Sequence, residues 1–258
     1  MENKTAMEIR DVHFAYGSHK VLKGVNASIQ EGKITTLMGA NGCGKSTLFS
    51  LLTKIRTPEE GEITLYDRNV SGFSLKAFAK KVAIVQQYNR ASNDITVEKL
   101  VSFGRTPYRK CFGGLTKKDQ EKIDQAMEET HITHLRNREV SRLSGGQRQR
   151  VWIAMALAQD TKILFLDEPT TYLDIRYQIE ILELIKKLNV KYGITIIMVL
   201  HDINQAIHYS DSIIGLKDGK VLAEGDPEQI ITEEMLETLY DIHLSVREMD
   251  GKKIVLNA

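Results

Sequence analysis

Cysteine is scarce in this sequence of 258 residues, which contains only Cys43 and Cys111. The two cysteines provide neither a disulfide framework nor a metal-binding spacing, so a reducing cytoplasm is the expected environment. Long apolar runs are missing as well, because the longest of note, residues 194–200, is far too short to cross a bilayer. The N-terminal segment MENKTAMEIRD has no apolar core, and we expect no signal peptide there. Any association with a membrane is therefore expected to be peripheral.

An excess of charge of either sign is also missing. The formal net charge is +1, so no global basic field favours nucleic acid, and we expect no nucleic-acid partner. The apolar fraction of 42% and the charged fraction of 27% are those of an ordinary globular protein. The length allows one large core, or a core with a subdomain.

Three short apolar runs predict buried strands, at residues 33–39, 162–167 and 194–200, and a plausible helix follows each one. Continuous apolar strands that alternate with helices indicate an α/β domain with a mostly parallel sheet. The first thirty residues instead suggest a small antiparallel sheet, followed by a turn at 31–33. Near the end, two Asp-Gly pairs between strand-like runs predict two hairpins.

A long helix is predicted from about Asp174 to Tyr192, with Asp174 as its N-cap and Gly193 closing it. Its apolar stripe is expected to consist of Ile175, Ile179, Leu182, Ile185 and Leu188. Residues from about 90 to 142 are polar and rich in helical patterns, with 117–130 the clearest helix. This stretch has the character of an inserted helical subdomain.

The segment GANGCGKST fits the pattern G-x-x-x-x-G-K-[ST] and lies between a predicted strand and a predicted helix. Its glycines let successive backbone N–H groups curl around phosphate oxygens at the start of the helix. Lys45 is expected to reach the β- and γ-phosphates, and the Ser46 hydroxyl to ligate Mg²⁺. A plain glycine-rich turn is the alternative. The predicted phosphate-binding residues are Gly39, Ala40, Asn41, Gly42, Cys43, Gly44, Lys45, Ser46 and Thr47.

The segment ILFLDEPT, residues 163–170, combines an apolar strand with two acidic residues at its end. Asp167 would place a carboxylate where it can hold a water bound to Mg²⁺. Glu168 would point to a different side and orient an attacking water as a general base. The alternative is an acidic strand end before a proline turn. Together with the phosphate-binding loop, this segment indicates a nucleoside triphosphatase.

The run LSGGQRQRVWIAMALAQ, residues 143–159, places a Ser-Gly-Gly turn before an apolar-faced helix. A helix start needs a cap, but two glycines and a glutamine exceed that need. In the order GANGCGKST, LSGGQ and ILFLDEPT, the sequence resembles the ATP-binding cassette (ABC) ATPases over essentially its whole length. The resemblance implies a P-loop NTPase core of the RecA-like type with a mostly parallel sheet and an N-terminal antiparallel β subdomain. It also implies a single ATPase domain over residues 1–258, with a helical subdomain at about 90–155.

The resemblance gives the LSGGQ motif a function in a dimer. In this family two cassettes pack head to tail, and the motif of one copy completes the ATP site of the other. The N-terminus of the helix would then hold the γ-phosphate of the partner's ATP. The residues expected to do so are Leu143, Ser144, Gly145, Gly146 and Gln147.

Four further positions each match a functional residue of the family. Tyr16 matches the aromatic residue that stacks on adenine, the alternative being a core tyrosine. Gln87 matches the glutamine that contacts Mg²⁺ and links the core to the helical subdomain, although its neighbour Gln86 is an alternative. His201 matches the switch histidine that contacts the γ-phosphate, and a structural histidine is the alternative. Asp174 matches the loop that crosses the dimer interface, a role that is compatible with capping its helix.

The resemblance therefore implies ATP and Mg²⁺ as cofactors, with Ser46, Gln87 and Asp167 at the metal. Glu168, His201 and Gln87 would be the catalytic residues. Two ATP molecules would close the dimer and drive the helical subdomains, which pull on two permease subunits. Hydrolysis by the water at Glu168 would reopen it.

The sequences TTYLD and GRTPY resemble the corresponding segments of the importer ATPases for ferric siderophores, haem and cobalamin. Partners implied are a second copy of the chain, integral-membrane permease subunits and, indirectly, an extracellular substrate-binding protein. The location implied is the cytoplasmic face of the cell membrane. GRTPY belongs to a region that faces the permease in this family, so Arg105, Tyr108 and Arg109 are candidate contacts. A solvated basic surface is the alternative for each.

Three rival functions compete with this prediction. A cassette of an exporter for lipids or drugs is disfavoured by GRTPY and TTYLD, through resemblance alone. A non-transport ABC ATPase acting on ribosomes or DNA is disfavoured because the chain has one set of motifs and no sustained heptad run. A P-loop kinase or GTPase is excluded by LSGGQ and by the absence of an Asn-Lys-x-Asp motif.

Overall fold

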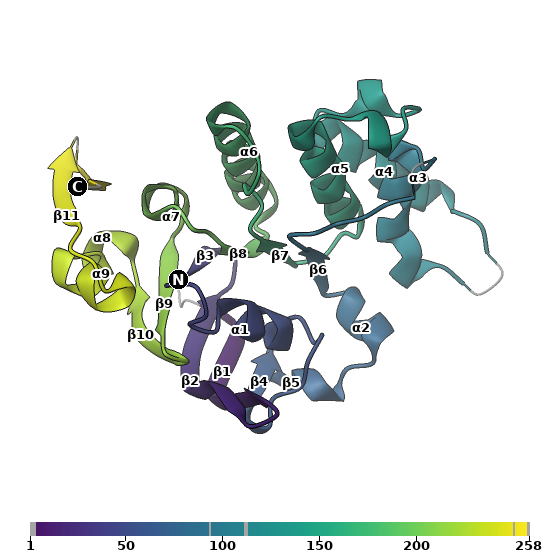
Figure 1. Ribbon diagram of the computed structural model, residues 1–258. Helices are drawn as coiled ribbons and strands as arrows, with labels where there is room; N and C mark the ends of the chain where they lie inside the picture. Colours follow the sequence, from purple (N-terminus) through teal and green to yellow (C-terminus); the bar gives the residue numbers. More distant parts are fainter. Residues whose placement is uncertain (1–3, 93, 111–112, 250, 257–258) are drawn as a thin grey trace. The chain divides into compact units, whose positions relative to one another are not determined.

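The computed structural model describes residues 4–92, 94–110, 113–249 and 251–256, so Cys111 lies outside the described residues. The chain divides into two compact units (Figure 1). The first unit consists of Met1–Gly72 and Thr195–Ala258, and the second of Phe73–Ile194. The extent of the ATPase domain and of its helical subdomain stays a prediction.

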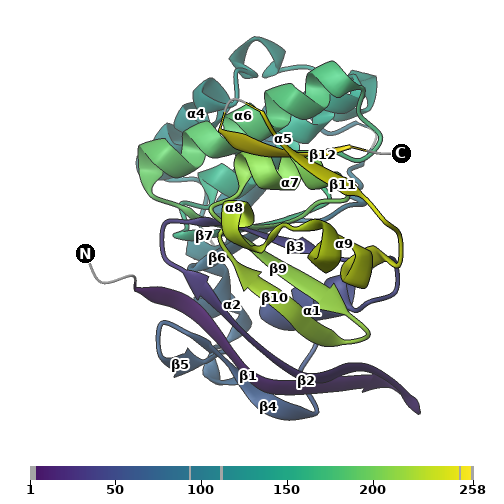
Figure 2. The same cartoon turned by 90° about the vertical axis from the view of Figure 1, so that its left-hand side faces the viewer.

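An antiparallel sheet forms one part of the first unit. Strand β1 (Thr5–Tyr16) pairs with β2 (His19–Gln30) on one side and with β4 (Glu60–Leu65) on the other (Figure 2). The short strand β5 (Arg68–Asn69) extends this sheet beyond β4, and η1 (Val70–Gly72) follows it. Alternate residues of β2, such as Val25, Ala27 and Ile29, are buried, as expected for a sheet with one covered face. The predicted N-terminal antiparallel sheet is confirmed.

Parallel strands form the other part of the first unit. Strand β3 (Ile34–Met38) lies between β8 (Thr195–Val199) and β9 (Ser212–Lys217) and is parallel to both. Every residue of β3 and β8 is buried, which is what their continuous apolar sequence predicts. The helices α1 (Lys45–Leu52) and α7 (Ile203–Tyr209) follow β3 and β8 respectively.

Both predicted hairpins are present in the first unit. Strand β10 (Lys220–Gly225) pairs with β9 through a turn at Asp218 and Gly219, both with positive φ, as a type I′ turn requires. Strands β11 (Ser245–Met249) and β12 (Lys252–Leu256) form the second hairpin. Its Asp250 lies outside the described residues. The connecting helices are α8 (Pro227–Ile230) and α9 (Glu233–Tyr240).

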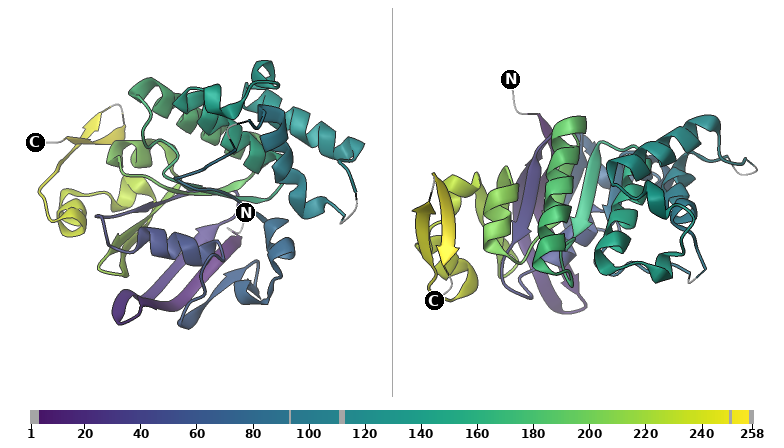
Figure 3. Two further views of the ribbon diagram at one scale, coloured as in Figure 1. Left: turned by 45° about the vertical axis from the view of Figure 1, so that its right-hand side comes forward. Right: turned by 90° about the horizontal axis from the view of Figure 1, so that it is seen from above.

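The second unit combines two parallel strands with helices. Strand β6 (Val82–Val85) is parallel to β7 (Ile163–Asp167). Helices α3, α4 and α5 pack against one another (Figure 3). The helices of this unit are α2 (Leu75–Ala79), α3 (Val97–Ser102), η2 (Phe103–Tyr108), α4 (Lys117–Glu129), η3 (Thr133–Leu135), η4 (Val140–Arg142), α5 (Gly145–Ala158) and α6 (Ile175–Tyr192).

Helix α6 has the predicted ends but not the whole predicted stripe. The Asp174 carboxylate accepts a hydrogen bond from the Tyr177 N–H at 3.1 Å, and Gly193 closes the helix with a φ of 61°. However, Ile175 and Ile179 are 76% and 47% exposed, so placing them in the core was wrong. At about 100° per residue, both lie on the Leu182 edge of the buried face, and Ile175 shares the direction of Leu182 to within about 20°. Their exposure therefore reflects their place in the first turns of the helix, where less of the chain packs against it. The buried apolar residues are Ile181, Leu182, Leu184, Ile185 and Leu188.

Candidate functional site

The loop between β3 and α1 follows a path that only glycine can take at two positions. Gly39 has a φ of 140°, and a Cβ there would lie 2.1 Å from the carbonyl oxygen of Leu216. Gly44 has a φ of 113°, and a Cβ there would lie 2.7 Å from a methyl carbon of Leu22. The N–H of Gly219 also donates to the carbonyl of Cys43 at 3.1 Å. The β9–β10 turn therefore supports the loop from behind.

The Lys45 side chain lies over this loop. Its Nζ donates hydrogen bonds to the carbonyl oxygens of Gly39 at 2.7 Å and Ala40 at 2.9 Å, and the residue is only 6% exposed. The Sγ of Cys43, equally buried, lies 3.8 Å from the same nitrogen. The positive charge is thus positioned at the predicted phosphate-binding residues.

The N-terminus of α1 is suited to an anion. Gly44 is its N-cap, no side chain caps the helix, and its first turn contains no acidic residue. The first N–H groups of a helix have no intrahelical partner, and the helix dipole favours negative charge there. Ser46 in this turn is exposed, whereas Thr47 is buried. The geometry fits the phosphates of a nucleotide.

Tyr16 and His201 lie at the ends of strands in the first unit. Tyr16, the last residue of β1, is 45% exposed, which excludes the core tyrosine considered as its alternative. Its ring meets Phe14 edge-on at 5.0 Å, and the Arg56 guanidinium lies 4.6 Å from its centroid. His201 is exposed and directly precedes Asp202, whose carboxylate caps α7. The roles of Tyr16 and His201 at ATP stay predictions.

In the second unit, two residues hold the carboxylate of Glu168. The side-chain amide of Gln87 and the hydroxyl of Thr171, the latter at 2.9 Å, both donate to its Oε2. Glu168 has a φ of 47°, an uncommon conformation for a residue with a Cβ. Of the two glutamines considered, Gln87 is the one whose side chain reaches Glu168. The carbonyl of Gln86 instead accepts from the Asn89 amide.

Two exposed tyrosines next to these residues were missed in the sequence. The hydroxyls of Tyr88 and Tyr172 lie 2.9 Å apart, with ring centroids at 6.3 Å. This hydrogen bond raises the pKa of Tyr88. The pair joins the segment after β6 to the segment after β7. The unusual tyrosine in TTYLD was the available signal.

The start of α5 forms a reciprocal cap. The Ser144 hydroxyl accepts from the Gln147 N–H at 3.3 Å, and the Gln147 side-chain oxygen accepts from the Ser144 N–H at 3.2 Å. Gln147 is therefore part of the cap, and the expectation that it exceeds the needs of a helix start was wrong. Leu143, which directly precedes the N-cap Ser144, is buried.

The two glycines of this motif also have a packing role. A Cβ at Gly146 would lie 2.7 Å from the ring of Tyr177, and one at Gly145 would lie 3.2 Å from Leu173. The helix start thus packs closely on residues 173–177, which include Asp174. The predicted contacts of Ser144, Gly145 and Gly146 with a partner's nucleotide stay predictions.

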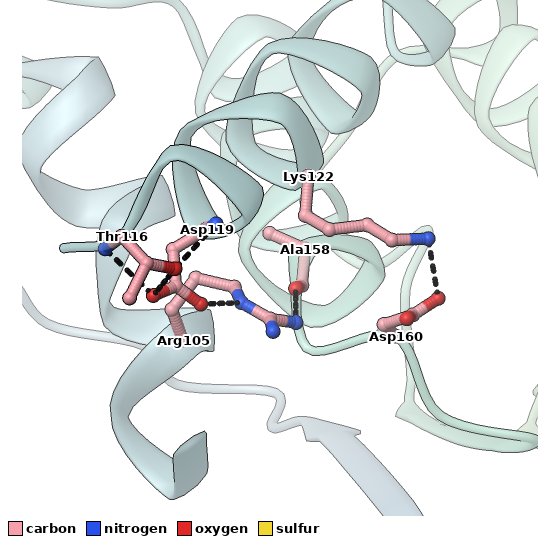
Figure 4. Close-up of polar contacts among 6 residues, drawn as sticks. All are labelled: Arg105, Thr116, Asp119, Lys122, Ala158 and Asp160. Carbon is pink, nitrogen blue, oxygen red and sulfur yellow. Dashed lines mark hydrogen bonds and ion pairs between the residues drawn. The ribbon is translucent and has the colours of Figure 1, made fainter. Parts of the chain in front are cut away.

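Arg105 does not lie on the surface, contrary to its prediction as a permease contact. It is 3% exposed, and its guanidinium donates to the Asp119 carboxylate and to the Ala158 carbonyl, each at 2.8 Å (Figure 4). A buried acidic partner fourteen residues away explains the difference. Arg109 is exposed and Tyr108 is half-buried, so these two remain candidate contacts.

An open groove lies beside η2 on the second unit. It has a volume of about 680 Å³, and its apolar lining is accompanied by polar and charged residues: Arg90, Ser92, Asp94, Thr96 and Lys99. Phe103, Trp152 and Met155 provide apolar surface from η2 and α5. The shape and composition suit an apolar segment of a partner protein.

A sequence model of the ABC transporter family matches residues 22–171, more than half of the chain. The chain belongs to the ABC transporter family. As a member of this family of ATPases, it binds and hydrolyses ATP. None of the helices in the described ranges is long and apolar enough to span a bilayer.

Several relatives match almost the full chain. The ferric enterobactin transport ATP-binding protein FepC of Escherichia coli (strain K12) is 43% identical over 90% of this chain and 85% of that protein. The iron(3+)-hydroxamate import ATP-binding protein FhuC of Bacillus subtilis (strain 168) is 43% identical, over 93% and 90%. The petrobactin import ATP-binding protein FpuC of Bacillus anthracis is 41% identical, over 93% and 88%.

Solved structures of ABC proteins have the same fold. A metal-chelate type ABC transporter in an inward-facing conformation matches with a TM-score of 0.85 and 28% identity, over 98% of both chains. A bacterial ABC transporter cassette solved as a dimer matches with a TM-score of 0.75 and 31% identity, over 86% of this chain and 98% of that one. The predicted fold class, an ABC-type α/β cassette with an antiparallel N-terminal sheet and a helical insert, is confirmed.

Proposed function

We propose that this ATPase energises the uptake of a ferric siderophore through a membrane permease. The observation that carries the proposal is the 41–43% identity, over at least nine tenths of the chain, to three relatives. Their names describe ferric enterobactin transport, iron(3+)-hydroxamate import and petrobactin import. Haem and cobalamin remain alternative cargoes from the resemblance. A cassette serving an exporter is the competing function.

ATP binding is assigned to the loop Gly39–Thr47 and to Tyr16. The uncapped start of α1 would receive the phosphates, and Lys45 would exchange its two carbonyl acceptors for phosphate oxygens. Tyr16 would stack on adenine with its exposed face. His201 would contact the γ-phosphate.

Ser46, Gln87 and Asp167 would hold Mg²⁺, because hydroxyl, amide and carboxylate oxygens are the ligands this ion takes in proteins. When bound, it would neutralise charge on the phosphates during their transfer. Glu168 would act as the general base that orients the attacking water. Its carboxylate already accepts hydrogen bonds from Gln87 and Thr171. Gln87 donates through its side-chain nitrogen, so its side-chain oxygen is the atom that would ligate the ion while this bond is kept.

The working assembly would contain two copies of the chain and two permease subunits. The capped start of α5, with Ser144, Gly145 and Gly146, would meet the partner copy's ATP, and the loop of Asp174 would contact the partner copy. The groove beside η2 would receive the permease, with Arg109 and Tyr108 at its edge. The chain would thereby associate peripherally with the cytoplasmic face of the membrane, opposite an extracellular substrate-binding protein.

The test is uptake in cells whose only copy of the chain carries Glu168→Gln. Cells are supplied separately with radiolabelled ferric enterobactin, a ferric hydroxamate, ferric petrobactin, haem and cobalamin. Loss of uptake of one siderophore, with the others unchanged, is the expected result. Cells carrying Glu121→Gln, an exposed glutamate on α4, serve as the matched control. Normal entry of all five compounds would contradict the proposal and favour the exporter.

A further inference from the structure

Arg105 connects three elements of the second unit from a buried position. Its Nε donates to the Oδ1 of Asp119 in α4, and its Nη1 donates to the carbonyl of Ala158 at the end of α5, each at 2.8 Å. Arg105 itself belongs to η2. Figure 4 shows its guanidinium between the two acceptors. The flat fork of donors thus bonds two helices at once.

Asp119 is itself held in place, so the contact is rigid on both sides. The N–H and the hydroxyl of Thr116 both donate to its Oδ2, at 2.9 and 2.6 Å. Asp119 is 5% exposed, and these bonds belong to the cap of α4. The Tyr108 ring covers the guanidinium, with its centroid 4.0 Å from the Arg105 Cζ. The neighbours of Arg105 therefore hold both of its hydrogen bonds in a fixed direction.

The neighbouring glycine brings η2 against α5 directly. A Cβ at Gly104 would lie 2.1 Å from the carbonyl oxygen of Met155. Backbone contact at Gly104 and the bond from Arg105 to Ala158 fix η2 to the last turn of α5 at two adjacent points. The first turn of the same helix carries the Ser144 cap. Because the backbone hydrogen bonds of an α-helix hold its length, a displacement of one end of α5 can be carried to the other end.

Stability alone does not account for the buried pair. Replacing a buried ion pair with apolar side chains of similar volume often leaves stability unchanged or raises it. Apolar side chains cannot supply this direction, because they lack the donors by which one planar guanidinium bonds η2 to both helices at once. The pair therefore specifies geometry more than it adds stability.

We propose that Arg105 is a positioning residue that makes η2 and α5, the helix that begins in the LSGGQ motif, move as one body. A displacement of η2 by the permease is then transmitted to Ser144. The proposal rests on the proposed function, because it needs a permease at η2. Arg105 does not touch the permease or ATP itself. It acts through Asp119 and Ala158.

Two variants separate this role from a purely structural one. Arg105→Lys keeps the charge, but its single nitrogen cannot reproduce the fork. The double variant Arg105→Met with Asp119→Asn removes both charges at similar volume, and the asparagine oxygen can still accept from Thr116 in the α4 cap. Lys122→Met is the matched control, because Lys122 bonds α4 to the residue Asp160 just after α5, at 2.9 Å and in a partly exposed position, rather than to η2 (Figure 4).

The tagged chain is purified with the membrane subunits that accompany it and placed in liposomes. ATPase activity is measured for this complex and for the isolated chain, with thermal unfolding for each variant. We expect both Arg105 variants to lower the permease-dependent part of the ATPase about tenfold, with the activity of the isolated chain changed less than about twofold. The double variant should stay folded, with an unfolding temperature at or somewhat below that of wild type, because it keeps the α4 cap but loses the ionised carboxyl. Lys122→Met should match wild type throughout.

Two results would overturn the inference alone. One is a folded Arg105→Lys complex whose permease-dependent ATPase equals that of wild type. The other is an equal fall in the complex and in the isolated chain, which would mark a structural role. A wild-type complex whose ATPase does not differ from that of the isolated chain would overturn the proposed function, and this inference with it.

Discussion

The side-chain amide of Gln87 donates a hydrogen bond to the carboxylate of Glu168, although 81 positions separate them in the chain. Gln87 lies two residues after β6, and Glu168 directly follows β7. The two strands are parallel neighbours, so their carboxyl ends meet at one edge. The proposed general base and the proposed metal-contacting glutamine thus form one hydrogen-bonded pair.

Glu168→Gln should bind ATP and hydrolyse it about 10²–10⁴ times more slowly than wild type, because a general base is lost. The glutamine oxygen can still accept from Gln87 and Thr171, so the local geometry should persist. Phosphate release and gel filtration with ATP provide the measurements, and a closed dimer should accumulate. Near wild-type turnover would rule out this assignment of the base.

A label on Cys43 should abolish ATP binding. Cys43 is 6% exposed, and its thiol lies 3.8 Å from the Lys45 amine. Labelling of the thiol should therefore be slow, and any added group must displace the loop between β3 and α1. The label is introduced in a Cys111→Ser background and followed by mass spectrometry, with nucleotide binding measured by fluorescence. Cys43→Ala treated with the same reagent is the control. Full ATPase activity after stoichiometric labelling would refute the prediction.

Gly146→Ala should destabilise the protein by about 1–3 kcal/mol, the usual effect of overpacking. Its Cβ would lie 2.7 Å from the Tyr177 ring. Gly145→Ala is the matched control, because its Cβ meets only a flexible end of Leu173 at 3.2 Å. Urea unfolding measures both, and Tyr177→Ser should rescue the first variant. Equal stability of the two alanine variants would show that the close packing at Gly146 is unimportant.

The Asp119 carboxyl should make stability fall at acid pH. The hydrogen bond from the Thr116 hydroxyl, followed by that from Arg105, lowers its pKa to about 2. A carboxyl with a depressed pKa stabilises the fold above its unfolded value of about 3.9, and this contribution is lost as the pH falls from about 4 towards 2.

The size of this pH effect is about 2 kcal/mol, from the same shift. Asp119→Asn should therefore flatten the dependence of the unfolding free energy on pH in that range, and thermal unfolding from pH 5 to 2.5 measures it. An unchanged slope in the variant would contradict the assignment. Asp160→Asn, which removes an exposed partner of Lys122, should leave the slope nearly as in wild type.

The strands and helix ends were predictable because local sequence determines them. The apolar runs of β3, β7 and β8 have no polar alternation, and Asp174 and Gly193 have the chemistry of helix caps. The stripe of α6 was predicted only in part, since the burial of Ile175 depends on what packs against it and not on its period. The local sequence does not specify which residues pack there.

Arg105 illustrates the same limit within the candidate site. A basic residue in the turn GRTPY is usually solvated, and its burial depends on an aspartate fourteen residues later and a carbonyl 53 residues later. The hydroxyl contact of Tyr88 and Tyr172 was hidden for the same reason. The predicted phosphate-binding loop, by contrast, is contiguous in sequence, so all of its candidate residues can be listed from the sequence alone.

The chain contains a single tryptophan, Trp152, which lines the groove beside η2 and is 7% exposed. Its ultraviolet emission therefore comes from one known place, without any introduced dye. A peptide or permease segment that enters the groove would change the polarity around the indole and shift that emission. The protein thus carries a built-in optical reporter of what occupies this surface.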